Sequence, residues 1–223
     1  MDIKIPYTPR KHQAYLHKKI SENRWNVLVC HRRFGKTVCM INHLIRSALL
    51  SKNKNPRYAY IAPTFKQAKS IAWDYMKQFT AKIPYTKFNE TELRVDLPNG
   101  SRITLLGSEN SDGLRGIYLD GCVIDEYANV NERLFPEIIR PALSDRKGYC
   151  VFIGTPQGMN NNFYELYQHA QGADDWFNYK AKASDTKIVD DEELVKAKEV
   201  MGDKKYQQEF ECDWIANIEG AVY

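Results

Sequence analysis

The segment CHRRFGKT, residues 30–37, has the residue types of a phosphate-binding loop. It ends in Gly35-Lys36-Thr37 and stands between a short apolar segment and an amphipathic one. Such a loop points successive backbone N–H groups into one concavity at a helix N-terminus, and adds a lysine for the terminal phosphates and a hydroxyl for Mg²⁺. Cys30 replaces the usual first glycine, so the GxxxxGK[ST] pattern is missed at one position. The context favours a phosphate loop over an ordinary turn before a basic helix.

We therefore predict that this loop binds a nucleoside triphosphate with Mg²⁺. Lys36 would contact the β and γ oxygens, and Thr37 would be a metal ligand. The expected nucleotide-binding set consists of the loop residues whose amides wrap the phosphates, namely Arg32, Arg33, Phe34, Gly35, Lys36 and Thr37.

A second motif, CVIDE at residues 122–126, brings an apolar run to a pair of carboxylates. Asp125, at the end of a strand, would reach the Mg²⁺, and Glu126 would polarise the attacking water. By itself such a pair is often a solvated turn. Its position after Lys36, with at least one strand between them, suits the P-loop ATPases whose catalytic glutamate adjoins the Mg²⁺-binding aspartate. Together the two motifs predict a nucleoside triphosphatase.

A third motif, GTPQG at residues 154–158, closes the next apolar strand. A polar residue at the end of the strand beside the acidic one can lie under the γ-phosphate and report its loss. Thr155 and Gln157 are the candidates. Without the other two motifs, this segment would be interpreted as a Pro/Gly turn.

These motifs need a frame that brings several strand ends together. Fully apolar strands are predicted at residues 25–30, 58–62, 121–125 and 149–154, with helices between them at 36–50, 64–79 and 131–143. Buried apolar strands that alternate with helices indicate an α/β fold with a mostly parallel sheet between helices. The turn Pro98-Asn99-Gly100 between two alternating segments predicts a hairpin.

The pattern changes after residue 158. A helix near 162–170, a strand-like FNYKAKA and two helices near 190–200 and 203–210 suggest a small, mainly helical appendage. We place the boundary at residue 172, which gives a core of residues 1–172 and an appendage of residues 173–223.

Composition excludes several other classes of protein. With 43% hydrophobic and 27% charged residues in 223, the chain is neither disordered, collagen-like nor repetitive. The five cysteines form no CxxC pair, which indicates reduced thiols, and no apolar run is long enough for a membrane span, so we expect a cytosolic protein. Residues 1–60 carry a net charge of +11 and the remainder −7. A polyphosphate, DNA or an acidic subunit could meet this basic third, which is otherwise a solvated face.

The combination of motifs resembles the ATPase domain of the large terminase subunit, the DNA-packaging motor of tailed bacteriophages. The resemblance covers nearly the whole chain and implies an ASCE (RecA-like) P-loop NTPase core with a small C-terminal helical lid. It rests on Gln13, HRRFGKT, GLRG at 113–116, VIDE at 123–126, GTPQGMNNNFYELY at 154–167 and the ending YQQEFECDWIANIEGAVY.

The resemblance also implies roles for individual residues. Gln13 would hold the adenine edge, with Tyr7 or Arg10 beside it. Arg32 would swing onto the γ-phosphate. Arg115 would act in the next subunit's site, where an arginine supplied in trans stabilises charge on the transferring phosphoryl group. Phosphate release would be sensed through Thr155.

The cofactors implied are ATP and Mg²⁺. The partners implied are double-stranded DNA, a portal protein, a small terminase subunit and further copies of the chain in a ring, with no membrane. The location implied is the host cytoplasm, at the portal vertex of the procapsid, outside the mature virion. Complete terminases resemble two-domain proteins with a nuclease domain; here the chain is expected to stop at the linker toward it, without nuclease activity. DNA contacts are equally plausible at Lys18, Lys19, Arg24, Lys52, Lys54 and Arg57.

Two other functions remain open from the residues. A superfamily 2 type helicase shares a glutamine ahead of the loop and an Asp-Glu pair, but needs a second RecA-like domain that about 50 residues after the core cannot form. A nucleotide-gated scaffold that binds DNA or a portal ring would have no use for Glu126.

Overall fold

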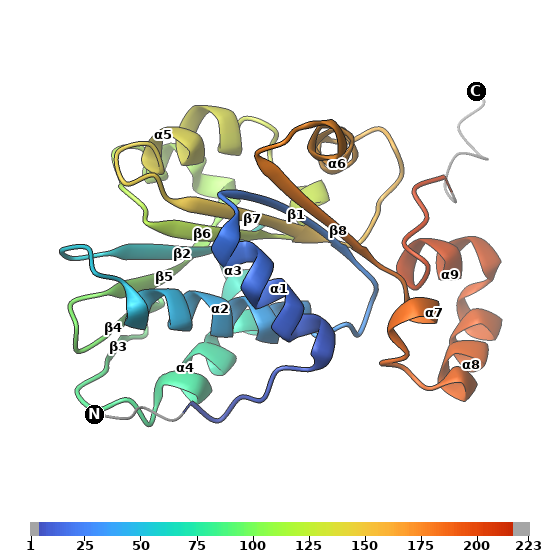
Figure 1. The fold of residues 1–223 in the computed structure, drawn as a ribbon, viewed down its shortest axis with the longest axis horizontal. Coiled ribbons are helices and arrows are strands. Elements are labelled where there is room, and N and C mark those ends of the chain that lie inside the picture. Colours follow the sequence, from blue (N-terminus) through green and yellow to red (C-terminus); the bar gives the residue numbers. More distant parts are fainter. Residues whose placement is uncertain (1–4, 216–223) are drawn as a thin grey trace.

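One sheet forms the frame of the molecule. In the computed structural model, which describes residues 5–215, eight strands are hydrogen-bonded in the order β3-β4-β5-β2-β6-β7-β1-β8 (Figure 1). Every pair from β5 through to β8 is parallel, and the β3-β4-β5 edge is antiparallel. The strands are β1 Trp25–Cys30, β2 Arg57–Ala62, β3 Lys87–Asn89, β4 Arg94–Asp96, β5 Arg102–Gly107, β6 Gly121–Asp125, β7 Tyr149–Gly154 and β8 Trp176–Ala181.

The central strands are apolar because both faces of the sheet are covered. Strands β1 and β6 are buried at every position, as expected for a parallel sheet between helices. Within β1, Val27 and Val29 pack on one face and Leu28 on the other, following the period of two. Because the strands are parallel, their carboxyl ends meet at one edge, where β1 ends at Cys30, β6 at Asp125 and β7 at Gly154.

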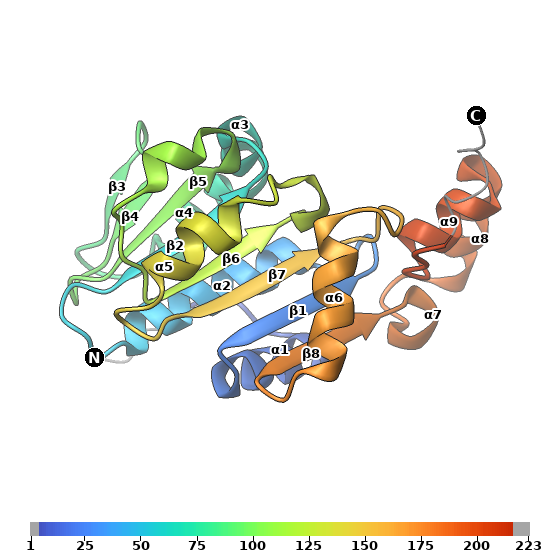
Figure 2. The same ribbon diagram turned by 90° about the horizontal axis from the view of Figure 1, so that it is seen from above.

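Helices α1, α2 and α4 lie on one face of the sheet, and α5 and α6 on the other (Figures 1 and 2). The α-helices are α1 Lys11–Glu22, α2 Lys36–Leu50, α3 Phe65–Ala68, α4 Asp74–Thr80, α5 Arg140–Ala142, α6 Asn162–Gly172, α7 Ala183–Thr186, α8 Asp191–Met201 and α9 Asp203–Glu209. Two π-helical turns, η1 Lys69–Trp73 and η4 Leu134–Ile139, and two 3-10 segments, η2 Ser108–Leu114 and η3 Tyr127–Asn129, complete the helical structure of residues 5–215.

Two of the expected helices are irregular. The helix predicted at residues 131–143 is the π-helical turn η4 followed by the single turn α5. Pro136 and Pro141 lie within it, and a proline has no N–H to donate to the helical ladder. The helix predicted at 64–79 is α3, η1 and α4 in succession.

The strand expected in the appendage is instead the edge strand β8 of the main sheet. It pairs in parallel with β1, from Trp25↔Trp176 to Cys30↔Ala181. The sheet therefore extends past residue 172, which is the last residue of α6. Beyond β8, helices α7, α8 and α9, called the lid helices below, stand at one end of the molecule around a small apolar cluster of Ala183, Leu194 and Phe210 (Figure 1).

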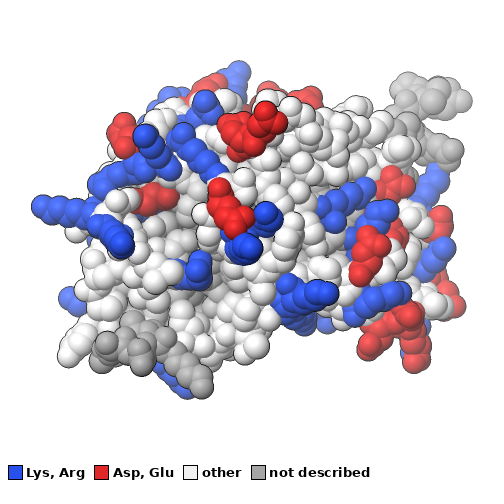
Figure 3. Space-filling model, in the orientation of Figure 1, with Lys and Arg blue, Asp and Glu red and all other residues white. Residues whose placement is uncertain are grey.

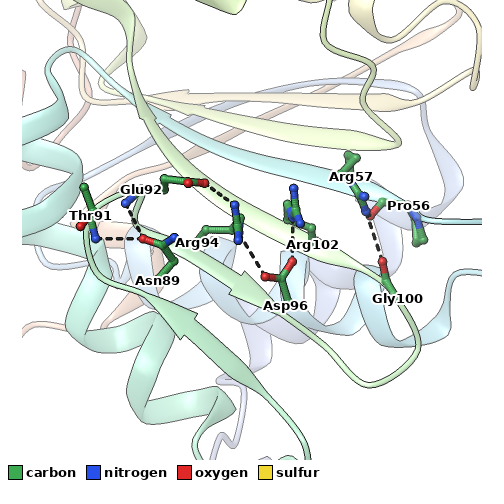
Figure 4. A network of polar contacts seen from close by, with 9 residues as sticks. All are labelled: Pro56, Arg57, Asn89, Thr91, Glu92, Arg94, Asp96, Gly100 and Arg102. Atoms are coloured by element: carbon green, nitrogen blue, oxygen red, sulfur yellow. Dashed lines mark hydrogen bonds and ion pairs between the residues drawn. The ribbon is translucent and has the colours of Figure 1, made fainter.

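The predicted hairpin is present, and it has a third strand that the sequence did not indicate. Strands β4 and β5 pair across the Pro98-Asn99-Gly100 turn, where Gly100 has a φ of +83° that favours glycine, and β3 pairs with β4. Asp96 accepts from Arg94 at 3.1 Å and from Arg102 at 2.6 Å, which ties the two strands together (Figure 4).

No helix in the described part of the chain has both the length and the apolar character needed to cross a membrane.

Candidate functional site

The phosphate loop predicted from the sequence connects β1 to α2. Arg33 and Gly35 have φ values of 71° and 89°, so the backbone turns through the left-handed region twice before the helix begins at Lys36. Alternation of this kind aims neighbouring N–H groups at one concavity. The first turn of α2, which includes Lys36 and Thr37, also leaves N–H groups without intrahelical acceptors. The loop thus has the backbone form of an anion cradle.

Residues at the N-terminal end of helix α1 support the loop through hydrogen bonds. Gln13 Nε2 donates to the Gly35 carbonyl at 3.3 Å, and Arg10 Nη1 donates to the Phe34 carbonyl at 3.4 Å. Gln13 Oε1 accepts the Arg10 N–H at 3.0 Å, and the Gln13 side chain is buried. A Cβ at Gly35 would lie 2.9 Å from Gln13 Nε2, so both the positive φ and the close approach require glycine there. The structure places Gln13 beneath the loop as a support.

Two of the six backbone N–H groups that were predicted to wrap the phosphates already donate to protein carbonyls. The Arg32 N–H donates to the Glu209 carbonyl at 2.8 Å, and the Phe34 N–H donates to the His31 carbonyl at 3.3 Å. The Phe34 ring is fully buried and makes edge contacts with the rings of His12 and His31. The Phe34 ring is therefore unavailable to a nucleotide, and its N–H and carbonyl are both bonded within the protein.

The acidic pair lies at the end of β6. Asp125 is buried; its Oδ1 accepts the Glu126 N–H at 2.9 Å, and its Oδ2 accepts the Tyr60 hydroxyl. Tyr60 thus holds one of the two predicted metal ligands in place. Burial raises the pKa of Asp125 above its ordinary value, although Tyr60 and Lys36 act in the opposite direction. The sequence analysis did not identify Tyr60.

Glu126 is the residue where the chain turns away from the strand. Its φ of 48° is in the left-handed region, an uncommon conformation for a residue with a side chain, and such outliers cluster at functional sites. Burial and the adjacent Asp125 charge raise the pKa of Glu126 to about 6, whereas Lys36 and Arg32 favour its ionised form. The pKa of this carboxyl group therefore lies closer to neutral pH than that of an ordinary glutamate.

Lys36 connects the loop with the third motif. Its Nζ donates to the Cys30 carbonyl at 3.3 Å and to Thr155 Oγ1 at 3.4 Å. Thr155 is buried and follows β7, which lies between β1 and β6. Gln157 is exposed, and its carbonyl accepts from Asn161 Nδ2 at 3.2 Å. The structure thus brings Thr155, but not the Gln157 side chain, into contact with Lys36.

The two predicted arginines lie on different elements. The Arg32 side chain is 63% exposed, and its Nη1 is 3.9 Å from Glu209 Oε2. Arg115 follows η2, and its Nη2 is 3.5 Å from Glu137 Oε2 on η4. Arg33 is exposed on the loop.

A cavity of about 570 Å³ lies between the loop and the lid helices. Arg10, Arg32 and Arg33 line one side, and the lid contributes Ile188, Val189, Asp190, Glu193, Ala197, Met201 and Phe210. Another cavity, of about 620 Å³, lies between α1 and α2 and is lined by Tyr7 but by none of the loop residues. Tyr7 bonds with His17 Nε2 at 3.0 Å, so it faces away from the loop, whereas Arg10 borders the loop cavity.

The donor set fits Mg²⁺ held together with a nucleotide. Asp125 and Thr37 offer one carboxylate and one hydroxyl, and Mg²⁺ is usually bound by one or two protein groups plus phosphates and water. Within residues 5–215, no three His, Cys, Asp or Glu side chains are grouped to hold a metal by themselves.

This fold and these strand-end motifs define an α/β protein of the P-loop NTPase class. In the described sheet, β7 lies between β1, which leads into the phosphate loop, and β6, which ends at Asp125. Thr155 directly follows β7. That order is the ASCE arrangement the motifs predicted.

Comparison with known proteins gives the family. The family described as terminase large subunit, T4likevirus-type, N-terminal, matches residues 30–223, so the chain belongs to it. The terminase large subunit of Thermus phage G20c is 26% identical over 182 residues, covering 73% of this chain and 36% of that protein. The chain thus spans about a third of the length of this curated relative.

Solved structures agree on the fold. The large terminase ATPase domain of Thermus phage P74-26 superposes with a TM-score of 0.79 at 22% identity, covering 95% of this chain and 96% of that one. The large terminase of a thermophilic bacteriophage, in complex with ADP, has a TM-score of 0.78 at 16% identity, covering 92% of this chain and 53% of that one.

Proposed function

We propose that the chain is the motor part of a terminase large subunit, which hydrolyses ATP to drive double-stranded DNA into a viral procapsid. This proposal rests on five residues that meet at the carboxyl ends of the parallel strands, namely Lys36, Thr37, Asp125, Glu126 and Thr155. Membership of the terminase family and the ADP bound to the large terminase of the thermophilic bacteriophage support the choice of nucleotide and process.

The proposed chemistry divides among these side chains. Lys36 pairs with the β and γ oxygens, while Thr37 and Asp125 hold the Mg²⁺ that neutralises phosphate charge when bound. Glu126 accepts a proton from the attacking water; its raised pKa suits a base working near neutral pH. Arg32 in cis or Arg115 from a neighbouring subunit stabilises the charge that develops on the transferring group.

The cavity of about 570 Å³ is the proposed site of the base and ribose. It adjoins the loop, and it combines the cationic Arg10, Arg32 and Arg33 with the apolar lid residues Ile188 and Val189. An apolar wall with a few polar groups is typical of small-molecule sites. Gln13 supports the loop that borders this cavity, so it acts on the nucleotide through Gly35.

The lid helices are the proposed moving part. Thr155 contacts Lys36, and the lid is bonded to the loop at Arg32, so loss of the γ-phosphate can alter both contacts. In place of the appendage of residues 173–223 expected from the sequence, we assign β8 to the core and propose residues 182–215 as the described part of the lid. A ring of copies, a portal protein and a small terminase subunit are the proposed partners, at the portal vertex in the host cell.

A phosphate-release assay tests the proposal. Glu126→Gln removes the base while keeping the shape of the side chain, so turnover should fall at least about a hundredfold with nucleotide affinity retained. Glu132→Gln, an exposed carboxylate a few residues away, is the matched control and should hydrolyse ATP normally. Native turnover by the Glu126→Gln variant would disprove the assignment.

A further inference from the structure

The end of the sheet opposite the phosphate loop, where the parallel strands begin, is strongly basic. Strands β2 and β7 begin there, after the segments 51–56 and 144–148. Lys and Arg side chains gather over this end of the molecule, at the left of Figure 3, whereas acidic and basic side chains mix over the lid helices. We call the following five residues the amino-end face: Lys52, Lys54, Arg57, Arg146 and Lys147.

The charges of this face are not compensated by carboxylates. Among the described residues, none of the five forms an ion pair. Arg57 instead donates through Nη1 to the carbonyls of Pro56 at 3.1 Å and Gly100 at 3.2 Å (Figure 4). The nearby Arg94 and Arg102 differ, because Asp96 pairs with both of them.

The acidic residues of these segments do not change that balance. Asp120 is buried and accepts from Asn53 Nδ2 at 2.6 Å and from the Arg57 N–H at 2.8 Å. Asp145 is exposed but has no cationic partner among the residues described. The face therefore keeps a net positive charge.

Contacts around Tyr118 join the segments into one surface. The Arg146 guanidinium lies 4.7 Å from the centre of the Tyr118 ring, and the Arg57 guanidinium lies 5.9 Å from it. The Tyr118 hydroxyl donates to the Asn55 carbonyl at 2.9 Å, and Arg146 Nη1 donates to the Lys54 carbonyl at 3.4 Å. The cations are thus held on linked loops and not on independent ones.

We propose that the amino-end face binds the phosphate backbone of double-stranded DNA. Cations without ion-pair partners on a shared surface, here three exposed lysines and two half-buried arginines, gain affinity for a polyanion by releasing its counterions. A protein partner would need buried aromatic or apolar anchors, whereas three of the five side chains of this face are exposed lysines. The choice of DNA as the polyanion rests on the proposed function.

The position of the face lets DNA and nucleotide bind together, because they occupy opposite edges of the sheet. The face is also connected to the segment that carries Arg115, since Tyr118 follows Arg115 by three residues.

The test is charge reversal of the three exposed lysines, Lys52→Glu, Lys54→Glu and Lys147→Glu in one variant. Anisotropy of a labelled mixed-sequence duplex is measured between about 50 and 200 mM salt. We expect binding at the lowest salt to weaken at least about tenfold. The slope of log K against log salt should also fall, by about 0.9 for each phosphate that the variant no longer neutralises.

The matched control reverses Lys66, Lys69 and Lys82, which are exposed elsewhere and change the net charge equally. The control should keep the wild-type slope. Equal loss in the control, unchanged binding in the test variant, or wild-type binding to polyglutamate but not to duplex would overturn the proposal.

ATP hydrolysis and thermal unfolding are measured on the same samples. The test variant should unfold at the wild-type temperature and keep basal hydrolysis, because its substitutions lie at the far edge from Lys36. A wild-type chain that binds duplex through this face but hydrolyses no ATP at any protein concentration would refute the proposed function and leave the DNA-binding face standing.

Discussion

Arg32 of the phosphate loop and Glu209 at the end of α9 are joined through both backbone and side chains. The Arg32 N–H donates to the Glu209 carbonyl at 2.8 Å, and Arg32 Nη1 lies 3.9 Å from Glu209 Oε2. Next to them, His31 Nε2 lies 2.8 Å from Thr186 Oγ1. The Glu209 carboxylate is 14% exposed, so it is a largely buried charge beside the loop. The loop and the lid helices are therefore in direct contact through both backbone and side chains.

The first prediction concerns Glu209→Gln. The amide keeps the backbone bond but removes the charge that pairs with Arg32 and repels polyphosphate. Affinity for a non-hydrolysable ATP analogue should rise relative to ADP, at most about fivefold because Arg32 is well exposed. Titration calorimetry with both nucleotides measures the ratio.

Two comparisons make this prediction specific. Glu211→Gln removes a neighbouring carboxylate that accepts from Ser184 Oγ at 2.6 Å, and should leave the ratio unchanged. In an Arg32→Ala background, Glu209→Gln should have a smaller effect, because only the repulsion of polyphosphate remains and Glu209 keeps its other ion pair, with Lys205 at 3.0 Å. A ratio that stays at the wild-type value in Glu209→Gln contradicts the coupling.

The sequence predicted the parts of the site that depend on local pattern. The apolar runs of β1, β6 and β7 and the helix from Lys36 have the predicted bounds, because a buried parallel strand is apolar throughout. The Asn-Gly turn before β5 was predicted for a similar reason, since Gly100 adopts a backbone conformation that few residues tolerate.

The remaining features depend on pairing between distant segments. In YAYIA, nothing distinguishes Tyr60 from Tyr58; only the pairing of β2 with β6 brings Tyr60 to Asp125. Likewise, the membership of β8 in the sheet comes from its register with β1. No local pattern distinguishes Glu209 from the other charged residues of its helix. Its contact with Arg32 joins two residues separated by most of the length of the chain.

The second prediction concerns Tyr60→Phe. The change leaves Asp125 Oδ2 without the buried hydroxyl that it accepts from, so the free energy of unfolding should fall by about 1–3 kcal/mol. Nucleotide affinity in the presence of Mg²⁺ should fall as well, because Tyr60 holds Asp125, a predicted metal ligand. Urea unfolding and nucleotide titration measure the two effects.

Tyr58→Phe on the same strand is the control for that change. Its hydroxyl donates to the Ser47 carbonyl at 3.2 Å, so the variant should lose about 1 kcal/mol and bind nucleotide normally. Equal nucleotide affinity in the two variants would mean that Tyr60 has a purely structural role.

The third prediction is an acid-sensitive stability set by two stacked histidines. The Nδ1 atoms of His17 and His43 are 3.1 Å apart between α1 and α2. Burial lowers the pKa of His17 to about 4 and that of His43 to about 3, and Arg46 adds to both shifts. The unfolded chain, with histidine pKa values near about 6.5, binds more protons below that pH, so stability is lost as the pH falls from about 6.5 toward 4.

Substitutions show which residues cause this loss of stability at low pH. Each buried histidine contributes a slope of up to about 1.4 kcal/mol per pH unit in that window. His43→Leu should remove up to that much slope, whereas His169→Gln, an exposed site, should remove none. Glu126 has the opposite sign, since its raised pKa lets the folded chain take up a proton first. Urea unfolding of His43→Leu with the full wild-type slope would refute the histidine origin.

The fourth prediction tests whether Arg115 acts between subunits. Arg115 pairs with Glu137 on η4 and lies on a different element from the loop, and its proposed role is in the site of a neighbouring subunit. Arg115→Ala should bind nucleotide as the wild type does, yet lose about a thousandfold or more in turnover even when concentrated, the size typical of an arginine finger. Arg133→Ala, which removes another partner of Glu137, at 4.0 Å, is the matched control and should remain active.

Mixing of two inactive variants distinguishes action in trans from action in cis. An Arg115→Ala subunit retains Glu126, and a Glu126→Gln subunit retains Arg115, so an interface between them can hold one complete site. Phosphate release by the mixture should exceed that of either variant alone and should rise with total protein concentration, because assembly creates the site. If the mixture recovers nothing at any ratio, or if Arg115→Ala alone reaches the wild-type rate at high concentration, Arg115 does not complete a neighbour's site and the catalytic arginine is the one within the loop, Arg32.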